Sequence, residues 1–381
     1  MERGWCAVEQ RRRVFVVTLV LVGAAWCTER HACAQRIGAD IAALNLCLYG
    51  DCEARGAYAA DPYGFANPGT LAAGTLPLLP RGAFVSQSYF RLNVGGVGLD
   101  VTSPSITLAA DPWVFEANVI YADGGGTARS LPGTDLRTYV RMVRLAAGVD
   151  LGRTTLGIKG LSVGLLAGVP GTTSDLHLTA GGFTLVDSHE DHELGLTPGI
   201  HWRAGERDWF NVGAFLQVER HHESAKAVEP FSQVPTVTYQ HGTTNAWFSR
   251  VGLSVLPFVP LDLTTSPPLA EMLGEMRLAV DFEYRNISAL GEPTAADEIG
   301  YFGLDARVLP DAWNPLSDYL RLYVITGVDT HTGWGIGAGL WGNGPLEFLS
   351  CNPAYSSRPL APSLGDRVDV WAATCAVVVP W

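Results

Sequence analysis

The chain has 381 residues, of which 47 % are apolar and only 17 % are charged, and its formal net charge is −12. A soluble domain usually carries about 25 % charged residues, so the surface of this protein is short of charge. The acidic balance excludes a nucleic-acid binder, because recognition of a polyanion requires a basic face. The high apolar content excludes a disordered chain.

The first 34 residues have the pattern of a secretory signal peptide. Arg11, Arg12 and Arg13 form a basic region, and the apolar run Val14–Trp26 is shorter than the roughly 20 residues that span a bilayer. Ala32-Cys33-Ala34 then provides a small-residue cleavage site. We therefore expect residues 1–34 to be removed on export. An uncleaved anchor, or cleavage nearer Ala25, is the alternative.

Cleavage at that site leaves four cysteines, Cys47, Cys52, Cys351 and Cys375. An even number of cysteines in an exported protein indicates disulfides. Of the three possible pairings, pairing of sequence neighbours would join Cys47 to Cys52 and Cys351 to Cys375. Free buried thiols are the alternative.

Alternation of apolar and polar residues over about ten positions is the main structural signal. In residues 275–285 one face holds Met276, Leu278, Val280, Phe282 and Tyr284, and the other holds Glu275, Arg277, Asp281, Glu283 and Arg285. Segments 208–221, 301–308 and 319–329 alternate in the same way. About ten residues is the length that a tilted strand needs to cross a bilayer, so each segment has one face for lipid and one for water.

Ten further segments have a suitable length for strands: 82–92, 97–108, 112–123, 138–150, 155–168, 173–186, 191–203, 243–256, 331–341 and 366–379. Longer loops are expected at 222–242, 257–274, 287–298 and 342–365. Because an open sheet edge cannot satisfy its backbone groups in lipid, the strands must close. The sequence therefore predicts an all-β fold, an antiparallel transmembrane β-barrel of about 14 strands over residues 81–381. A soluble β-sandwich or propeller is the alternative.

Aromatic residues are expected at the level of the lipid headgroups, where amphipathic rings are favoured. Candidates are Trp113, Tyr121, Trp202, Trp209, Trp247, Tyr284, Tyr319, Trp334 and Trp381. The chain also finishes on alternate non-polar residues, Cys375, Val377, Val379 and Trp381. This ending is similar to the terminal strand signal of outer-membrane barrels.

Residues 35–80 do not alternate, and we expect them to fold in the lumen as a plug or to hang in the periplasm. They include Asn67-Pro68-Gly69-Thr70-Leu71-Ala72 just before the first strand. This motif resembles the Asn-Pro-Ala-x-Leu-Ala motif of the long-chain fatty-acid transporter (FadL-like) family, with Gly69 in place of the usual alanine. The length, the strand number, the segment Gly342–Phe348 and the aromatic C-terminus agree with the resemblance.

Members of that family are 14-stranded barrels whose N-terminal plug blocks the lumen and whose wall releases hydrophobic substrates sideways. The resemblance implies passive, plug-gated uptake of hydrophobic small molecules, such as long-chain fatty acids or hydrocarbons, across the outer membrane of a Gram-negative bacterium. It also implies outer-membrane lipid, lipopolysaccharide and the barrel-assembly machinery as partners. Asn67, Pro68 and Gly69 are expected to form a hinge or anchor of the plug, because proline fixes φ and glycine permits unusual backbone angles.

Four charged residues of the alternating segments are candidates for a lumenal binding site. Arg277, Arg285, Arg321 and Asp281 face the lumen if the alternation is read correctly. Arginines and acids opposed across a barrel can pair and brace the wall. Alternatively, the arginines bind the carboxylate of a substrate, because a guanidinium group matches a carboxylate with two hydrogen bonds.

A Gly-x-Ser-x-Gly sequence occurs at Gly160–Gly164, but it lies in a glycine-rich strand pattern rather than at the strand-to-helix turn of a nucleophile elbow. We therefore expect no catalytic residue, no metal site and no cofactor, and a protein that is not an enzyme. Two other functions are open: an outer-membrane scaffold or secretion-associated barrel without transport, and, less favoured, a barrel lipid hydrolase.

Overall fold

The computed structural model describes residues 59–60, 67–94, 97–127, 134–168, 172–180, 183–205, 208–229, 236–259, 267–288, 295–330, 332–342, 349–359 and 367–380. The expected signal peptide, Cys47, Cys52 and Trp381 lie outside these ranges. No helix within them is long and apolar enough to span a membrane.

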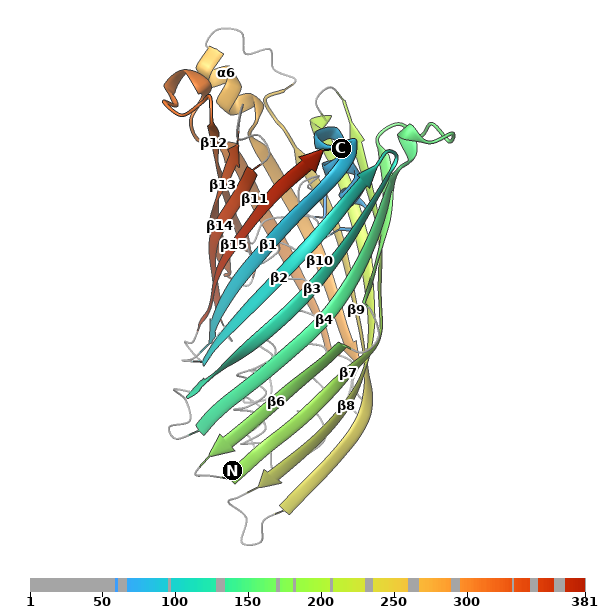
Figure 1. The fold of residues 1–381 in the computed structure, drawn as a ribbon, viewed down its shortest axis with the longest axis vertical. Helices are drawn as coiled ribbons and strands as arrows, with labels where there is room; N and C mark the ends of the chain where they lie inside the picture. Colours follow the sequence, from blue (N-terminus) through green and yellow to red (C-terminus); the bar gives the residue numbers. More distant parts are fainter. Residues whose placement is uncertain are drawn as a thin grey trace.

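Helices are few and strands dominate the described chain (Figure 1). The elements are α5 (Thr70–Leu78), β1 (Arg81–Val94), β2 (Val97–Ala110), β3 (Trp113–Thr127), β4 (Thr134–Asp150), the 3-10 turn η4 (Leu151–Arg153), β5 (Leu161–Gly168), β6 (Thr172–Ala180), β7 (Phe183–Ala204), β8 (Phe210–Glu229), β9 (Thr236–Val255), α6 (Pro267–Gly274), β10 (Arg277–Ser288), β11 (Ala295–Arg307), the 3-10 turn η6 (Asp311–Trp313), β12 (Leu320–Asp329), β13 (Trp334–Gly342), β14 (Leu349–Pro359) and β15 (Arg367–Pro380).

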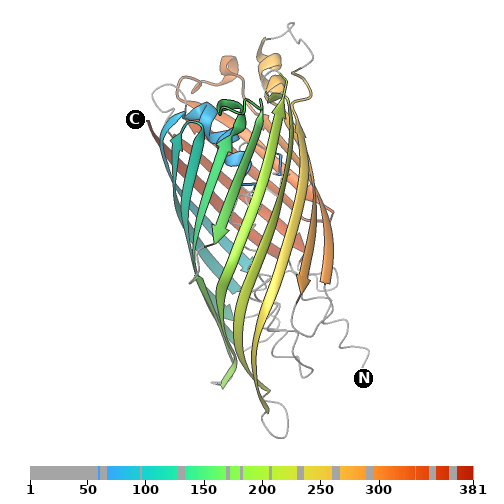
Figure 2. The ribbon, with the colours of Figure 1, turned by 90° about the vertical axis from the view of Figure 1, so that its right-hand side faces the viewer.

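The strands form one antiparallel sheet that closes on itself (Figures 1 and 2). β1 pairs with β2 and with β15, and β3 pairs with β4. β5 and β6 each pair with both β4 and β7, so together they fill one interrupted position in the wall. The barrel therefore has 14 strand positions, as the alternation predicts, and no open edge.

The strand number is confirmed, but the assignment of individual strands differs from the prediction. Segments 155–168 and 173–186 are not two wall positions, because β5 and β6 share one. The strand that replaces the lost one is β14, inside the segment 342–365 that was expected to be a loop. Pro353 conceals it in the sequence, because proline cannot donate to a β-ladder. The pairing of β13 with β14 accordingly skips from Gly337–Ala354 to Leu340–Cys351.

The loop expected at 222–242 is also wrong for most of its length. β8 continues to Glu229 and β9 begins at Thr236, and the two strands pair up to these two residues. β7, β8 and β9 are the longest strands of the barrel, with 22, 20 and 20 residues. They extend beyond the other strands at the lower end of Figure 1.

The outer wall of the barrel is apolar, and the inner wall carries the buried polar groups. On β10, Leu278, Val280 and Phe282 are exposed, whereas Asp281 and Glu283 are buried. A soluble protein has the reverse distribution, and a barrel with an apolar outer face is built to be surrounded by lipid. The predicted two faces of segments 208–221, 275–285 and 301–308 are confirmed in this way.

The apolar outer band has a defined height. One end of the barrel, which we call the helix-bearing rim, holds η4, α6, η6, the start of β1 and the end of β15 (Figure 1). About ten residues from this rim, the height that a bilayer-crossing strand needs, the exterior becomes charged. The outward positions there are Arg91, Asp100, Asp123 and Arg141 on β1 to β4.

Candidate functional site in the barrel lumen

A helix lies inside the barrel close to the helix-bearing rim. α5 packs on the inner faces of β3, β4, β5 and β7 (Figure 2). Its Leu71 and Leu76 are buried with Ala109 of β2 and Val114 of β3. We call residues 59–60 and 67–80 the lumenal segment. They are the part of the expected plug 35–80 that the structure describes.

A band of glycines gives the lumenal segment room against the wall. The inner faces of five neighbouring strands, β4, β5, β7, β8 and β9, contribute Gly148, Gly164, Gly199, Gly213 and Gly252. A Cβ atom at Gly164 would overlap the carbonyl oxygen of Pro68, and one at Gly213 would overlap that of Ala59. Glycine is needed at these positions because backbone approaches backbone.

Asn67 links the two described parts of the lumenal segment to the wall. Its side-chain amide donates to the carbonyl oxygens of Ala59 at 2.7 Å and of Ile200 on β7 at 2.9 Å. Its Oδ1 accepts from the backbone N–H of Gly69 at 2.9 Å. Asn67 is fully buried and cannot bond to solvent water, so these three hydrogen bonds satisfy its amide instead.

The turn at Asn67-Pro68-Gly69 also begins α5. The backbone N–H and the hydroxyl of Thr70 both donate to the carbonyl oxygen of Asn67, at 2.9 and 2.7 Å. A Cβ atom at Gly69 would lie 2.7 Å from the backbone of Ile200, so the alanine usual in the FadL-like motif does not fit here without a shift. Glycine at position 69 therefore matches the close approach of the turn to β7.

A buried charge pair holds Ala59. Its backbone N–H donates to Oδ2 of Asp281 on β10 at 2.7 Å, and Nε of Arg250 on β9 donates to the same oxygen at 2.7 Å. Both charged side chains are fully enclosed. The guanidinium group of Arg250 also lies 3.5 Å from Glu283 and 4.1 Å above the ring of Tyr301. A buried pair of this kind fixes geometry, because removal of one partner leaves an uncompensated charge.

The carbonyl oxygen of Ala60 is held from two strands. The hydroxyl of Ser254 on β9 donates to it at 3.1 Å, and Nε2 of His201 on β7 lies 3.2 Å away. Arg277 on β10 in turn donates to the Ser254 hydroxyl at 3.1 Å. The wall therefore binds Ala59 and Ala60 through their backbone atoms. Their small methyl side chains allow this close approach.

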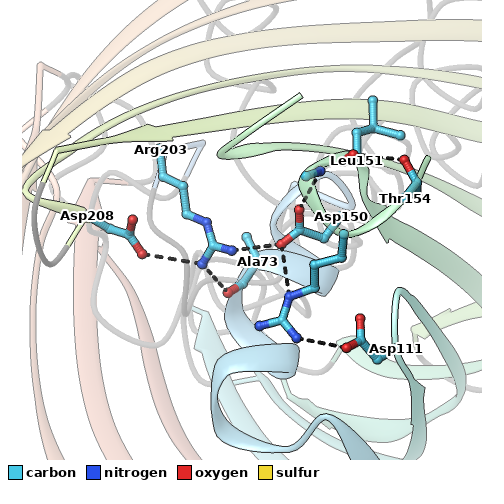
Figure 3. Close-up of polar contacts among 9 residues, drawn as sticks. Ala73, Asp111, Asp150, Leu151, Thr154, Arg203 and Asp208 are labelled. Atoms are coloured by element: carbon cyan, nitrogen blue, oxygen red, sulfur yellow. Dashed lines mark hydrogen bonds and ion pairs between the residues drawn. The ribbon is translucent and has the colours of Figure 1, made fainter. Parts of the chain in front are cut away.

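A second polar network joins α5 to the rim (Figure 3). Arg203 on β7 donates to Asp150 at 2.7 Å, to Asp208 at 3.3 Å and to the carbonyl oxygen of Ala73 in α5 at 3.4 Å. Arg153 in η4 contacts Asp150 at 3.6 Å and Asp111 at 3.1 Å. Asp150 therefore connects the turn after β4 with the strand that holds the helix.

The four predicted lumenal residues do not form one cluster. Arg277 and Asp281 are buried on β10, where both support the contact with Ala59 and Ala60. Arg285 lies further along β10, at the register position opposite Phe248 and Asp297. Arg321 lies on β12, and its buried Nε has no hydrogen-bond partner among the described residues.

Sequence reasoning overlooked Arg250, Ser254 and the glycines of the band. Arg250, Gly252 and Ser254 alternate along β9 with the exposed Val251 and Leu253. That local period of two was a usable signal, but the apolar Phe248 on the same inner face weakens it. Their role depends on which strands are neighbours, and the alternation does not give that order.

Two further predictions concern individual residues of the wall. Ser162 of the Gly-x-Ser-x-Gly sequence is buried on β5 opposite His201, within a strand and beneath the lumenal segment. Gly164 of the same sequence belongs to the glycine band. Cys351 and Cys375 form a disulfide between β14 and β15. No group of three or more residues that could hold a metal ion occurs in the part of the chain that the structure describes.

Solved structures share this fold at low sequence identity. A Pseudomonas aeruginosa FadL homologue is 9 % identical and the match covers 86 % of this chain and 97 % of that one, with a TM-score of 0.51. A deltaS2S3 mutant of the monoaromatic hydrocarbon channel TodX is 10 % identical over 87 % and 98 %, with a TM-score of 0.50. The Pseudomonas putida toluene transporter TodX itself is 10 % identical over 87 % and 97 %, with a TM-score of 0.47.

No family model matches the sequence, and no curated protein matches it significantly. The likeness is therefore one of fold, and it rests on the matches with TM-scores of 0.51 and 0.50.

Proposed function

Because the chain has the fold of the FadL-type outer-membrane barrels, we propose that it is an outer-membrane channel for passive uptake of hydrophobic small molecules, with residues 35–80 as its plug. The observation that carries this proposal is the lumenal segment, held by backbone contacts inside a closed barrel with an apolar outer wall. A hydrocarbon channel and a FadL homologue among the structural neighbours support the same substrate class.

The plug acts as a gate in this proposal. Its described part is held by a small number of polar contacts from Asp281, Ser254, Asn67 and Arg203. Each of these polar contacts ends on a backbone atom of the segment or of the wall, and Leu71 and Leu76 add apolar packing against β2 and β3. Substrate passes through the lumen when these contacts break, and the plug blocks the lumen to ions when they are intact.

The orientation of the barrel in the membrane is part of this proposal. β1 begins and β15 ends at the helix-bearing rim, and the expected signal peptide directs export. We assign this rim to the periplasm and the extended ends of β7, β8 and β9 to the cell exterior. The expected lateral release of substrate has a candidate position at the interruption between β5 and β6, where β4 changes partner from Gly168 at Arg144 to Thr173 at Arg141.

One arginine of the inner wall is better placed than the others to bind the carboxylate of a substrate. Arg277 is engaged by Ser254, and Arg250 by Asp281, whereas the Nε of Arg321 is buried and has no hydrogen-bond partner among the described residues. We assign Arg321 to the headgroup of a long-chain fatty acid. Arg277 and Asp281 then brace the wall and hold the plug, which is the first of the two roles that the sequence left open.

The test uses cells that lack their own transporter of this kind. Uptake of labelled oleate and of a labelled monoaromatic hydrocarbon is compared for the wild type, a deletion of residues 35–80 and Arg321→Met. Folding of each variant in the outer membrane is checked by the heat-dependent shift of the barrel on a gel. We expect the deletion to change uptake of both compounds and to raise ion conductance in planar bilayers.

Arg321→Met should lower oleate uptake several-fold and leave hydrocarbon uptake unchanged, whereas Arg277→Met, which disturbs the contact with Ala60, should change uptake of both compounds. If the deletion variant folds and transports both compounds like the wild type, the plug proposal fails. If the folded wild type transports neither compound, the channel proposal fails and the scaffold barrel becomes the favoured function.

A further inference from the structure

The turn between β4 and β5, residues 151–160, carries an apolar tip that the described chain does not cover. Leu156 is 67 % exposed and Ile158 is 46 % exposed. The turn projects sideways from the helix-bearing rim, at the right-hand side of Figure 1. An exposed aliphatic pair on a projecting element indicates a binding surface.

The turn is ordered by its own hydrogen bonds and does not depend on a partner for its shape. Gly152 N–H donates to Oδ1 of Asp150 at 2.9 Å, the Thr154 hydroxyl donates to the carbonyl oxygen of Leu151 at 2.8 Å, and Gly157 N–H donates to that of Thr154 at 3.1 Å. Gly157 has a φ of +62°, which a residue with a side chain rarely adopts. The tip is therefore presented in a fixed conformation.

The charge of the turn is opposite to that of the whole chain. Residues 151–160 contain Arg153 and Lys159 and no acidic residue, in a protein with a net charge of −12. Lys159 is one of only two lysines in the sequence and lies exposed beside Ile158. Aliphatic side chains next to a long cationic one suit the boundary of a lipid leaflet, where the cation reaches the headgroups.

The tip is continuous with the lipid-facing wall. Leu145 on β4 and Leu165 on β5 are both about half exposed on the outer face, and Leu161 and Val163 lead from β5 to the turn. An anionic protein partner would meet Lys159 but would leave the aliphatic pair unexplained. A lipid leaflet accounts for both the apolar and the cationic residues.

We propose that the 151–160 turn inserts into the leaflet at the helix-bearing rim, with Leu156 and Ile158 in the acyl boundary and Lys159 at the phosphate of an anionic phospholipid. This proposal requires the barrel to lie in a bilayer and is independent of what the barrel transports. The turn then sets the depth of the rim in the membrane, next to the Asp150–Arg203 network that holds α5.

The test places a nitroxide label at Leu156→Cys in a Cys47→Ser/Cys52→Ser background. The full chain is reconstituted in vesicles of phosphatidylethanolamine and phosphatidylglycerol, and the heat-dependent gel shift verifies folding. Accessibility to oxygen and to a water-soluble nickel chelate is measured by power saturation. A label at Asp318→Cys, exposed in a polar position of another turn at the same rim, is the matched control.

We expect the label at position 156 to have several-fold lower accessibility to the nickel chelate than the label at position 318. Its depth should decrease when phosphatidylcholine replaces phosphatidylglycerol, and Lys159→Gln should remove this lipid dependence. Equal accessibility of the two labels to the nickel chelate would overturn the proposal. Dipolar broadening between labels of two molecules would also overturn it, because a second copy would then cover the tip.

Discussion

Two helices lie near the same rim, and the barrel holds them by opposite means. α5 and the residues before it are held in the lumen by close backbone contacts with the glycine band and with Asp281 and Arg203 of the wall. The Asn67 amide of the segment and the apolar side chains of α5 complete the contact with the wall. α6 is held at the rim through side chains. Its Glu271 pairs with the buried Arg307 of β11, and Glu275, which follows the helix, accepts from the Tyr323 hydroxyl at 2.8 Å.

The difference shows which sequence changes each contact tolerates. A segment held close to the wall backbone tolerates a larger residue neither at its own buried alanines nor at the glycines of the wall. A charge-held helix tolerates changes in the wall that keep the arginine, but it depends on the carboxylates and on ionic strength. The two helices should therefore respond to different sequence changes in the barrel.

The largest effect is expected when the buried carboxylate that accepts from Ala59 N–H is removed. Asp281→Ala deprives Ala59 N–H of its partner and leaves Arg250 with the more distant Glu283. Breaking a buried pair costs about 3–5 kcal/mol. We expect faster hydrogen exchange of the peptide that contains residues 59–60 and a lower unfolding midpoint, with Arg250→Met/Asp281→Leu restoring the midpoint in part. Unchanged hydrogen exchange of this peptide in Asp281→Ala would contradict a role of Asp281 in holding Ala59.

The next largest effect is expected when a methyl group is added at a glycine of the band. Gly213→Ala places a Cβ against the carbonyl oxygen of Ala59, and overpacking of a fitted site costs about 1–3 kcal/mol. We expect ejection of the segment and a raised single-channel conductance. Gly274→Ala at the end of α6 is the matched control, since its Cβ would meet nothing within 4 Å. Equal conductance of the two variants would refute the glycine argument.

Loss of the Asn67 amide should have a similar or smaller effect. Asn67→Ala leaves the carbonyl oxygens of Ala59 and Ile200 without their donor, and an unsatisfied buried polar group costs about 1–3 kcal/mol. Asn67→Asp keeps the acceptor for Gly69 N–H but supplies no donor, so it should be at least as harmful. Protease sensitivity of the N-terminal region in folded barrels measures both. If the aspartate variant behaves like the wild type, the donor role is wrong.

The smallest effect is expected at α6. Arg307 has Glu271, Glu275 and Asp311 as partners, so Glu271→Gln removes one of three and should cost at most about 1 kcal/mol. Hydrogen exchange of the α6 peptide should rise modestly, and 1 M salt should produce a similar rise in the wild type. The peptide with residues 67–80 should respond to neither change. A response there would remove the distinction between the two helices.

The alternation predicted the barrel because a strand has two faces and lipid demands that one of them be apolar. For the same reason it placed Arg277 and Asp281 on the face of β10 whose side chains are buried. It missed β14 because Pro353 and a polar run leave no regular pattern, and it counted β5 and β6 separately because collinearity appears only when the pairing with β4 is known.

The candidate site was less accessible to sequence reasoning. Asp281 lies 222 positions from Ala59 in the chain, so their contact depends on the closure of the barrel. The Asn67-Pro68-Gly69 motif could be singled out through a family resemblance, but its contact with Ile200 could not. The glycines of the band looked like ordinary strand residues, because their requirement comes from a segment that enters the barrel from another part of the sequence.

The central claim is that the lumenal segment occupies the barrel and must move for transport. A Cβ atom at Gly148 would lie 3.5 Å from the Cβ of Ala72, within the range in which a disulfide forms. The measurement is uptake of a labelled hydrophobic substrate by Ala72→Cys/Gly148→Cys in a Cys47→Ser/Cys52→Ser background, oxidised and then reduced, with each single variant as control. The account predicts a cross-link in folded barrels that abolishes uptake, and recovery on reduction. Failure to cross-link, or full uptake by the cross-linked protein, would contradict it.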